Sequence, residues 1–290
     1  MVLAAGYGTR LRPLTDERPK PLVPIGDRPL IHHLAERLRD AGIVRLVVNS
    51  HHHADAFRGA EIDALPLQPV VLHEPEILGT AGGVHNACEA LGPGDVLVWN
   101  GDILADVDIA ALGLIHAQQQ TAATLAVCEA AEQPGTIGLD AEGKVVRLRA
   151  ERYGVEVRSA DFVGIQVLAA GLRAKLPPQG CLVADLYQPA LREGARVIAA
   201  SVVRRWQDVG TPAAYLEANL RWLDDQGQGS FIGPGARLDA LVSVDRSVVG
   251  RGAAVSGSGL LRRVVAWPGA HVQAPLEGAI VTTAGRIVRV

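Results

Sequence analysis

The stretch VLAAGYGTRLR at residues 2–12 decides the fold, because a short apolar strand leads there directly into a glycine-containing loop. Gly6 and Gly8 can adopt positive φ and let backbone amides approach a ligand closely. Arg10 and Arg12 follow, and guanidinium groups make bidentate contacts with phosphate. The stretch predicts a polyphosphate site after the first strand, although for this segment alone an ordinary surface turn remains an alternative.

Outward from this strand, short β-branched runs alternate with amphipathic stretches through the first two hundred residues. This alternation predicts an α/β fold with a mixed, mainly parallel sheet and helices on both faces. The expected buried strands are residues 2–5, 46–49, 70–73, 96–99 and 124–128, and the expected helices lie near 29–42, 81–91 and 109–119. Hairpin-like strands are expected at 137–139, 145–149 and 162–168, followed by a helix at 183–193, a strand at 197–203 and a helix at 211–224.

The last sixty residues follow a different pattern. Residues 232–236, 249–253 and 265–270 each place an aliphatic residue before a turn of small residues. Such spacing predicts a short β-helix of hexapeptide steps, and a glycine-rich β-meander is the alternative. We therefore expect a catalytic domain over residues 1–226 and a hexapeptide-repeat β-helix over residues 227–290.

Composition narrows the class of protein. Of the 290 residues 48% are hydrophobic and 20% are charged, which is typical of a globular chain, and the net charge is −3. Electrostatic capture of nucleic acid or of an anionic membrane is therefore not expected. Cys88, Cys128 and Cys181 form no Cys-x-x-Cys pair, and no apolar run reaches the roughly 18 residues of a membrane span. These observations predict a cytoplasmic protein.

Further charged residues follow predicted turns and strands. Lys20 stands between two prolines, which restrict the backbone and give the lysine a defined direction, although an exposed surface turn is the alternative. Asp102 follows the strand at 96–99, and Asp208 follows another strand, at the sheet edge where such folds bind ligands. Two carboxylates together with substrate phosphates suit Mg²⁺, whereas Asp208 could also serve as a helix N-cap.

Residues 4–15 and 18–25 together resemble the signature of the sugar-1-phosphate nucleotidylyltransferases, and the resemblance extends from residue 1 to about 225. It implies a Rossmann-like sheet on which a nucleoside triphosphate and a sugar 1-phosphate are joined, with Mg²⁺, and pyrophosphate is released. It implies four catalytic residues, Arg10, Lys20, Asp102 and Asp208, of which Asp102 and Asp208 bind the metal. The implied nucleotide-binding residues are Leu3, Ala4, Ala5, Gly6, Gly8, Thr9, Arg10, Lys20, Glu74, Gly79, Thr80 and Ala81.

The base and sugar sites are less completely matched. Residues 78–83 resemble the base-binding loop of the family, and Glu74 falls where a base-reading side chain is expected. Residues 162–165 resemble its sugar-side strand. Many members carry a Glu-Lys-Pro segment where this chain reads Ala-Glu-Arg-Tyr at residues 150–153, so an arginine replaces a lysine. The implied sugar-phosphate site consists of Gly138, Glu151, Arg152 and Gly164.

Within the family we interpret the chain as mannose-1-phosphate guanylyltransferase-like, with GTP favoured by the acceptor oxygens of Glu74. The alternatives are uridylyl or thymidylyl transfer to a sugar 1-phosphate, cytidylyl transfer to a non-sugar phosphate acceptor, and a non-catalytic homologue that senses a ligand. We assign the C-terminal β-helix, which resembles left-handed β-helices, a structural and oligomerising role, so a homo-oligomer is expected. Residues 51–53, three consecutive histidines, are interpreted as a polar loop, because adjacent side chains of an extended segment diverge.

Overall fold

A computed structural model of the protein describes residues 1–130 and 134–290. Contacts between Cα atoms divide the chain into two compact units, each described here by itself. The sheet unit comprises Met1–Gly6 and Leu34–Trp206, and the coil unit comprises Tyr7–His33 and Gln207–Val290. The residues that follow the first strand are thus grouped with the C-terminal strands, whereas the sequence places the boundary between residues 226 and 227.

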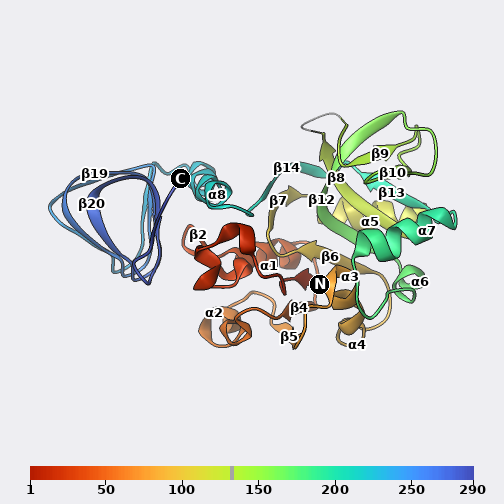
Figure 1. Ribbon diagram of the computed structural model, residues 1–290, viewed down its shortest axis with the longest axis horizontal. Coiled ribbons are helices and arrows are strands. Elements are labelled where there is room, and N and C mark those ends of the chain that lie inside the picture. Colours follow the sequence, from red (N-terminus) through yellow and green to blue (C-terminus); the bar gives the residue numbers. More distant parts are fainter. Residues whose placement is uncertain (131–133) are drawn as a thin grey trace. The chain divides into compact units, whose positions relative to one another are not determined.

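The sheet unit contains a mixed sheet whose parallel part carries the N-terminal strand (Figure 1). β1 lies between β4 and β6 and is parallel to both, while β5 is parallel to β4. β12 runs antiparallel beside β6 and connects the sheet to β8 and β9. The strands are β1 (Val2–Leu3), β4 (Leu46–Ser50), β5 (Pro69–His73), β6 (Val96–Asn100), β8 (Ala123–Glu129), β9 (Ile137–Leu139), β10 (Val145–Leu148), β11 (Glu151–Arg152), β12 (Arg158–Leu168) and β13 (Val197–Ala200). β7 (Ile103–Val107) pairs with β14 (Val203–Asp208) in a second sheet.

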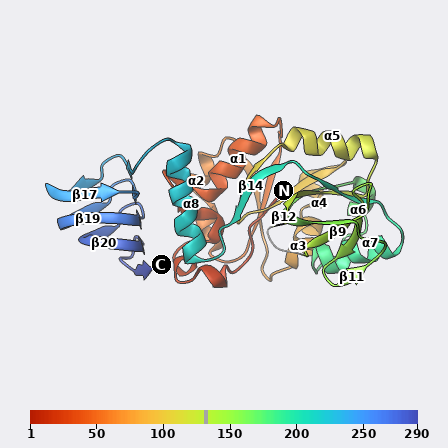
Figure 2. The same ribbon diagram turned by 90° about the horizontal axis from the view of Figure 1, so that it is seen from above.

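Helices cover both faces of this sheet, as Figure 2 shows for α5 on one side and for α3 and α7 on the other. The buried side chains of α3 and α7 share one hydrophobic core with β8, β9 and β13. The helices are α1 (Leu30–Asp40), which begins in the coil unit, α2 (Ala60–Asp63), α3 (Gly79–Asn86), α4 (Cys88–Leu91), α5 (Ile109–Gln119), α6 (Ala170–Arg173) and α7 (Gln188–Arg192). The predicted α/β fold with a mixed sheet is confirmed.

Several predicted elements have different bounds. The helix expected at residues 81–91 is interrupted at Ala87, where ψ is −4°, so that α3 and α4 are separate. The helix expected at 183–193 begins with a π-helical segment, Leu182–Tyr187, before α7. The strand expected at 197–203 ends at Ala200, because the amide of Val202 bonds back to the Ala200 carbonyl and turns the chain into β14.

The C-terminal strands of the coil unit are wound as stacked coils with a triangular outline (Figure 1). Phe231 lies opposite Val248, which lies opposite Val265, so one coil advances the chain by 17 residues, one fewer than three hexapeptide steps. Gly250 allows neighbouring coils to approach, because a Cβ there would lie 2.6 Å from the amide nitrogen of Pro268. The predicted β-helical region is confirmed. Its strands are β15 (Phe231–Ile232), β16 (Arg237–Leu238), β17 (Leu241–Asp245), β18 (Val248–Val249), β19 (Ala254–Ala266), β20 (His271–Val281) and β21 (Ile287–Arg289).

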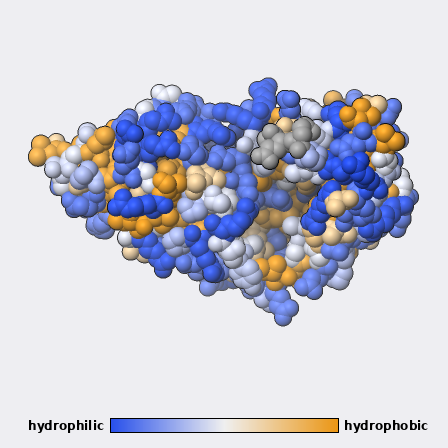
Figure 3. Space-filling model, turned by 45° about the horizontal axis from the view of Figure 1, so that its top comes forward, coloured by the Kyte–Doolittle hydropathy of each residue, from blue (hydrophilic) through white to orange (hydrophobic). Residues whose placement is uncertain are grey.

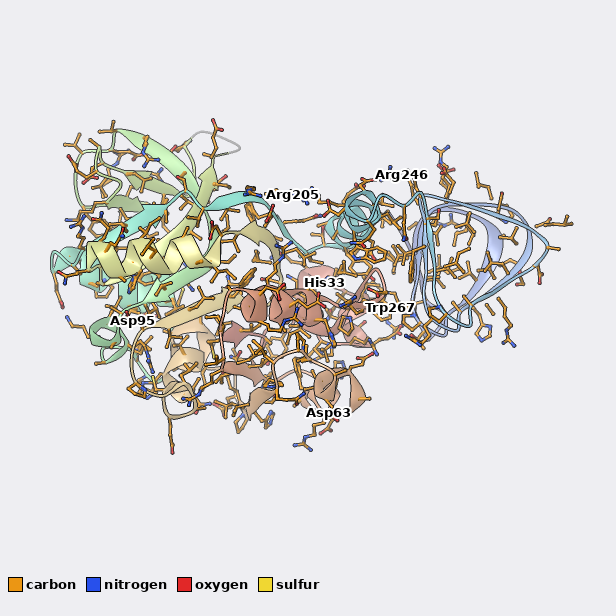
Figure 4. All side chains as sticks on the ribbon, turned by 180° about the vertical axis from the view of Figure 1, so that it is seen from behind. His33, Asp63, Asp95, Arg205, Arg246 and Trp267 are labelled. Carbon is orange, nitrogen blue, oxygen red and sulfur yellow. The ribbon has the colours of Figure 1, made fainter. Side chains whose placement is uncertain are left out.

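The N-terminal segment of the coil unit packs on α8 (Pro212–Asp225) and on the coils. It contains the short strands β2 (Pro24–Ile25) and β3 (Arg28–Pro29) and 3₁₀ turns at Thr9–Leu11, Leu14–Asp16 and Lys20–Leu22. The buried hydroxyl of Tyr215 in α8 donates to the Pro24 carbonyl at 2.5 Å and accepts from the Trp267 indole at 2.9 Å. Trp267 therefore joins the coils to α8, and Figure 4 labels it on the side of the coils that faces this segment.

Candidate active site

Three of the four predicted catalytic side chains meet within the coil unit. The Arg10 guanidinium contacts Oδ2 of Asp208 at 3.1 Å, and the Lys20 ammonium contacts Oδ1 of the same carboxylate at 3.3 Å. The Lys20 side chain is only 10% exposed, whereas that of Arg10 is 65% exposed. A buried and an exposed cation thus share one carboxylate, and an incoming polyphosphate could take over either of them.

The loop that carries Arg10 is held in a narrow set of conformations. The Thr15 hydroxyl donates to the Gly8 carbonyl at 2.9 Å, and Gly8 has a φ of 62° that favours glycine. A Cβ at Gly8 would lie 2.7 Å from the Thr15 methyl carbon. Gly210 is similarly restricted, because a Cβ there would lie 2.8 Å from Oδ1 of Asp208. Small residues on both sides therefore leave room for the carboxylate and the loop, which also contains the predicted residue Thr9.

The predicted base-side residues of the sheet unit gather at the carboxyl ends of β1, β4 and β5. The Ala4 amide donates to Oδ1 of Asn49 at 2.7 Å, and Nδ2 of Asn49 donates to Oε1 of Glu74 at 2.7 Å. The other carboxylate oxygen of Glu74 accepts from the Leu78 amide at 3.2 Å. Glu74 has no exposed surface in this arrangement. A contact between Glu74 and a base would therefore require one of these two hydrogen bonds to be exchanged.

The predicted nucleotide loop after Leu78 is anchored by a second loop of the sheet unit. The Ala81 amide donates to the Gly180 carbonyl at 2.8 Å, and the Leu182 amide donates to the Thr80 hydroxyl at 2.8 Å. Gly79 has a φ of 76°, and a Cβ there would lie 2.4 Å from the Gly180 carbonyl oxygen. These contacts fix the direction in which the first turn of α3 points its amide groups.

Asp102 lies in the turn between β6 and β7, beside the residues that follow β1. The amide of Gly101 donates to the Leu3 carbonyl at 2.8 Å, which brings this turn to the edge occupied by Ala4, Ala5 and Gly6. Gly164 of β12 has a φ of 77°, and a Cβ there would lie 2.5 Å from Nδ2 of Asn100. The glycine therefore gives space to the residue two positions before Asp102.

The predicted sugar-side residues pair with arginines and carboxylates of the same unit. Glu151 accepts two hydrogen bonds of 2.6 Å from Arg192, and this guanidinium lowers the pKa of the Glu151 carboxyl. Glu156 accepts hydrogen bonds of 2.8 and 3.0 Å from Arg147, which lower its pKa. Arg152 is 3.7 Å from Glu156.

Gly138 lies against this second pair. A Cβ at Gly138 would lie 2.4 Å from the carboxyl carbon of Glu156 and 2.8 Å from the Cβ of Arg147. The sugar-side residues thus lie among three ion pairs, Glu151–Arg192, Glu156–Arg147 and Glu156–Arg152. The side chains of Arg152 and Arg192 are 68% and 56% exposed, whereas that of Arg147 is 9% exposed.

Four residues of these sites were not identified from the sequence. Asn49 and Thr15 bind backbone groups, and Arg192 and Arg147 hold the two glutamates described above. Asn49 carried a signal, since it is a polar residue at the carboxyl end of a buried strand, where ligands of such sheets bind. Arg192 carried none, because it lies 41 positions from Glu151 and nothing in the sequence relates the two. Nδ1 of His51, in the histidine run, donates a hydrogen bond of 2.8 Å to the Glu74 carbonyl.

A model of the nucleotidyl transferase family matches residues 1–151, which is more than half of the chain. The chain belongs to this family. The predicted family is thereby confirmed, and the signature from which it was predicted lies within the matched residues.

Curated relatives cover most of the chain. A mannose-1-phosphate guanylyltransferase of Mycobacterium tuberculosis is 28% identical over 297 residues, covering 94% of this chain and 81% of the relative. An N-acetylmuramate alpha-1-phosphate uridylyltransferase of Caulobacter vibrioides is 33% identical over 235 residues, covering 76% of this chain and 95% of the relative. Family members similar to this chain therefore include a guanylyltransferase and a uridylyltransferase.

Solved structures show the same fold. The crystal structure of HddC from Yersinia pseudotuberculosis complexed with GMP-PN superimposes with a TM-score of 0.63 at 22% identity, covering 76% of this chain and 97% of that chain. A structure of apo-UDP-glucose pyrophosphorylase gives a TM-score of 0.63 at 18% identity and covers 78% of this chain and 98% of that chain. The predicted Rossmann-like fold is confirmed by these neighbours.

Proposed function

We propose that the protein transfers a nucleotidyl group from a nucleoside triphosphate to a sugar 1-phosphate and releases pyrophosphate. The observation that carries the proposal is the cluster of Arg10 and Lys20 on Asp208, which follows a glycine loop at the N-terminus of a nucleotidyl transferase chain. Two cations on one carboxylate, beside a glycine backbone that leaves room for a ligand, suit a triphosphate. The presence of these charged groups argues against a homologue that only senses a ligand.

The chemistry requires little proton transfer. A phosphate monoester has a second pKa of about 6, so the sugar 1-phosphate is already an anionic nucleophile near neutral pH. Its oxygen attacks the α-phosphorus in line, and pyrophosphate leaves as the bond to the β-phosphate oxygen breaks. We assign to Arg10 and Lys20 the stabilisation of the negative charge that develops on the phosphates, and to the loop around Gly8 their positioning.

The carboxylates of Asp102 and Asp208 have the donor chemistry that Mg²⁺ prefers, namely anionic oxygen. A bound Mg²⁺ would supply positive charge beside the transferred phosphate. Within the coil unit, Lys20 and Arg10 each face one oxygen of Asp208. Phosphates that draw these two cations away would free the carboxylate for a metal, so we expect metal and triphosphate to bind cooperatively.

We propose GTP as the preferred nucleotide and a mannose 1-phosphate-like sugar as the acceptor. The alignment with a mannose-1-phosphate guanylyltransferase, which covers 94% of this chain at 28% identity, supports this specificity. A carboxylate can accept from both N1–H and N2–H₂ of guanine, and Glu74 would do so after exchanging its hydrogen bonds to Asn49 and Leu78 for bonds to the base. Uridylyl transfer to a sugar 1-phosphate is the second candidate, supported by the 33% identity to the Caulobacter uridylyltransferase.

Location and assembly are part of the proposal. Among the residues that the structure describes, no helix combines the length and the apolarity needed to cross a membrane. We propose a cytoplasmic location. Hydrophobic residues reach the surface at the tip of the coils (Figure 3), and Leu241 is 76% exposed and Leu260 is 40% exposed. A homo-oligomer that covers such residues on the coils is therefore proposed.

The experiment that tests the activity measures pyrophosphate release with GTP and mannose 1-phosphate in Mg²⁺, with each substrate omitted in turn and with the metal chelated. The sugar nucleotide is identified by mass spectrometry. We expect release only when both substrates and the metal are present, and Asp102→Asn should lower turnover by orders of magnitude without unfolding the protein. Metal-independent release, or near-normal turnover of a folded Asp102→Asn variant, would contradict the metal role.

A further inference from the structure

We infer that the turn at the C-terminal end of the coils, residues 282–286, positions the loop that carries Arg10 and Lys20. This C-terminal turn follows β20 and is linked to Asp16 and Glu17, which lie between Arg10 and Lys20 in the chain. The inference rests on the proposed function, because it assigns to Thr282 and Arg286 an effect on the same reaction. Neither residue was predicted to have any functional role.

The Glu17 carboxylate contacts three groups of the C-terminal turn. Its Oε1 accepts from the Thr282 hydroxyl at 2.5 Å, and its Oε2 accepts from the Ala284 amide at 3.2 Å. The Arg286 guanidinium lies 3.6 Å from Oε1. Only 14% of the Glu17 side chain is exposed and Thr282 is buried, so the bond between them is partly shielded from water, whereas Ala284 and Arg286 are exposed. Charge-assisted hydrogen bonds in such surroundings are strong and directional.

The C-terminal turn is itself closed by hydrogen bonds, so it can act as a rigid support. The Thr282 amide donates to the Arg286 carbonyl at 3.0 Å, and the Gly285 amide donates to the Thr282 carbonyl at 3.0 Å. The Arg286 amide donates to the Thr282 hydroxyl oxygen at 3.2 Å, which leaves the hydroxyl hydrogen for Glu17. Thr282 has no exposed surface.

The contacts continue from the C-terminal turn to the loop. Arg286 contacts Asp16 at 3.1 Å, and Asp16 contacts Arg12 at 3.3 Å. The neighbouring Thr15 hydroxyl holds the Gly8 carbonyl. Asp16 ends a 3₁₀ turn that leads toward Lys20. The segment between the two catalytic cations is therefore fixed at its middle by the last turn of the chain.

Attachment of the coils does not require these contacts. Trp267, which is buried, already joins the coils to Tyr215 in α8. Arg286 is 49% exposed, and an exposed ion pair adds about 0–1 kcal/mol to stability. A purely structural role thus predicts a small effect of changing Arg286, whereas a positioning role predicts a larger effect on turnover than on folding.

The test uses the full-length protein with Thr282→Val, Arg286→Gln and Arg286→Lys. Arg262→Gln is the matched control, because Arg262 forms an exposed pair of 2.9 Å with Glu277 in the same coils, away from Glu17. Hydrogen exchange of peptides covering residues 8–22 is measured together with kcat, KM for the triphosphate and thermal stability. Exchange reports on the loop whether or not the assayed substrates are the right ones.

We expect the amide hydrogens of residues 8–22 to exchange on the order of tenfold faster in Thr282→Val and in Arg286→Gln than in the parent protein. In both variants kcat should fall by roughly tenfold with a smaller change in KM for the triphosphate. Arg286→Lys should recover part of the lost kcat, and the Arg262→Gln control should match the parent protein. Unchanged exchange in both variants would overturn the inference. Faster exchange with unchanged kcat would show that the C-terminal turn holds the loop but does not affect the reaction, which overturns the catalytic part of the inference. If Thr282→Val does not fold, the surface variant Arg286→Gln decides alone. A parent protein inactive with every substrate pair would contradict the proposed function but leave the exchange result to decide the positioning.

Discussion

Replacing Asp208 by Asn should reduce stability and turnover together, because one carboxylate neutralises two cations. Oδ1 lies 3.3 Å from the Lys20 ammonium, and Lys20 is only 10% exposed. At an effective dielectric constant of about 20, this attraction amounts to about 5 kcal/mol before desolvation is subtracted. The net loss for a hydrogen bond to a charged group is about 1.5–3 kcal/mol.

The second cation adds little to this loss. Arg10 is 65% exposed, so its pair with Asp208 adds about 0–1 kcal/mol. The two contributions together amount to about 1.5–4 kcal/mol, which should lower the melting temperature by roughly 3–16 °C in a chain of this size. Turnover should fall by orders of magnitude if Asp208 also binds the metal.

The assay combines calorimetric melting with pyrophosphate release at saturating substrates. Asp224→Asn is the matched control, because Asp224 is 56% exposed and contacts Arg246 at 3.1 Å in the same unit. The control should lose at most about 1 kcal/mol and keep its turnover. An Asp208→Asn protein with the melting temperature and turnover of the parent would refute the shared-carboxylate reasoning.

Three further predictions concern charge. Arg10→Ala and Lys20→Ala should depress kcat more than they raise KM for the triphosphate in steady-state kinetics. A raised KM with unchanged kcat in both variants would remove their catalytic role. Glu74→Gln should reduce the preference for GTP over UTP, measured as a ratio of kcat/KM, because an amide presents donors where guanine also donates; an unchanged ratio would show that Glu74 does not read the base. Arg147 lowers the pKa of Glu156, so the stabilisation is present above the ordinary glutamate pKa of about 4.3 and is lost as pH falls through the lower folded-state pKa. The free energy of unfolding in urea should therefore change less between pH 6 and 3 for Glu156→Gln than for the parent protein. The same pH dependence of this free energy in both proteins would contradict the prediction.

The parts of the fold that were predicted correctly depend on local patterns. The helix at 109–119 matches α5 because the Asp108 side chain caps it and the buried residues Ile109, Leu112 and His116 recur along one of its faces. The elements that differed depend on single backbone hydrogen bonds, such as the bond from Val202 to Ala200 that separates β13 from β14. Periodicity in the sequence carries no information about such a bond.

Site residues were predictable where one segment carried them. Arg10 and Lys20 lie within the two signature segments, and the structure places both on Asp208. The contacts of Glu17 with Thr282 span 265 positions, and neither residue belongs to a motif. Long-range pairs of this kind arise only from the way the coils pack, so sequence reasoning could not find them.

Nucleotidyl transfer to a sugar 1-phosphate is tested by a panel of substrates. Pyrophosphate release is measured with GTP, UTP, dTTP, CTP and ATP, each combined with mannose 1-phosphate, glucose 1-phosphate, N-acetylmuramate 1-phosphate and phosphocholine in Mg²⁺. We predict the highest kcat/KM for GTP with mannose 1-phosphate. UTP or dTTP used at least tenfold better than GTP would contradict the assigned base, and absence of release with every sugar 1-phosphate would contradict the proposed function itself.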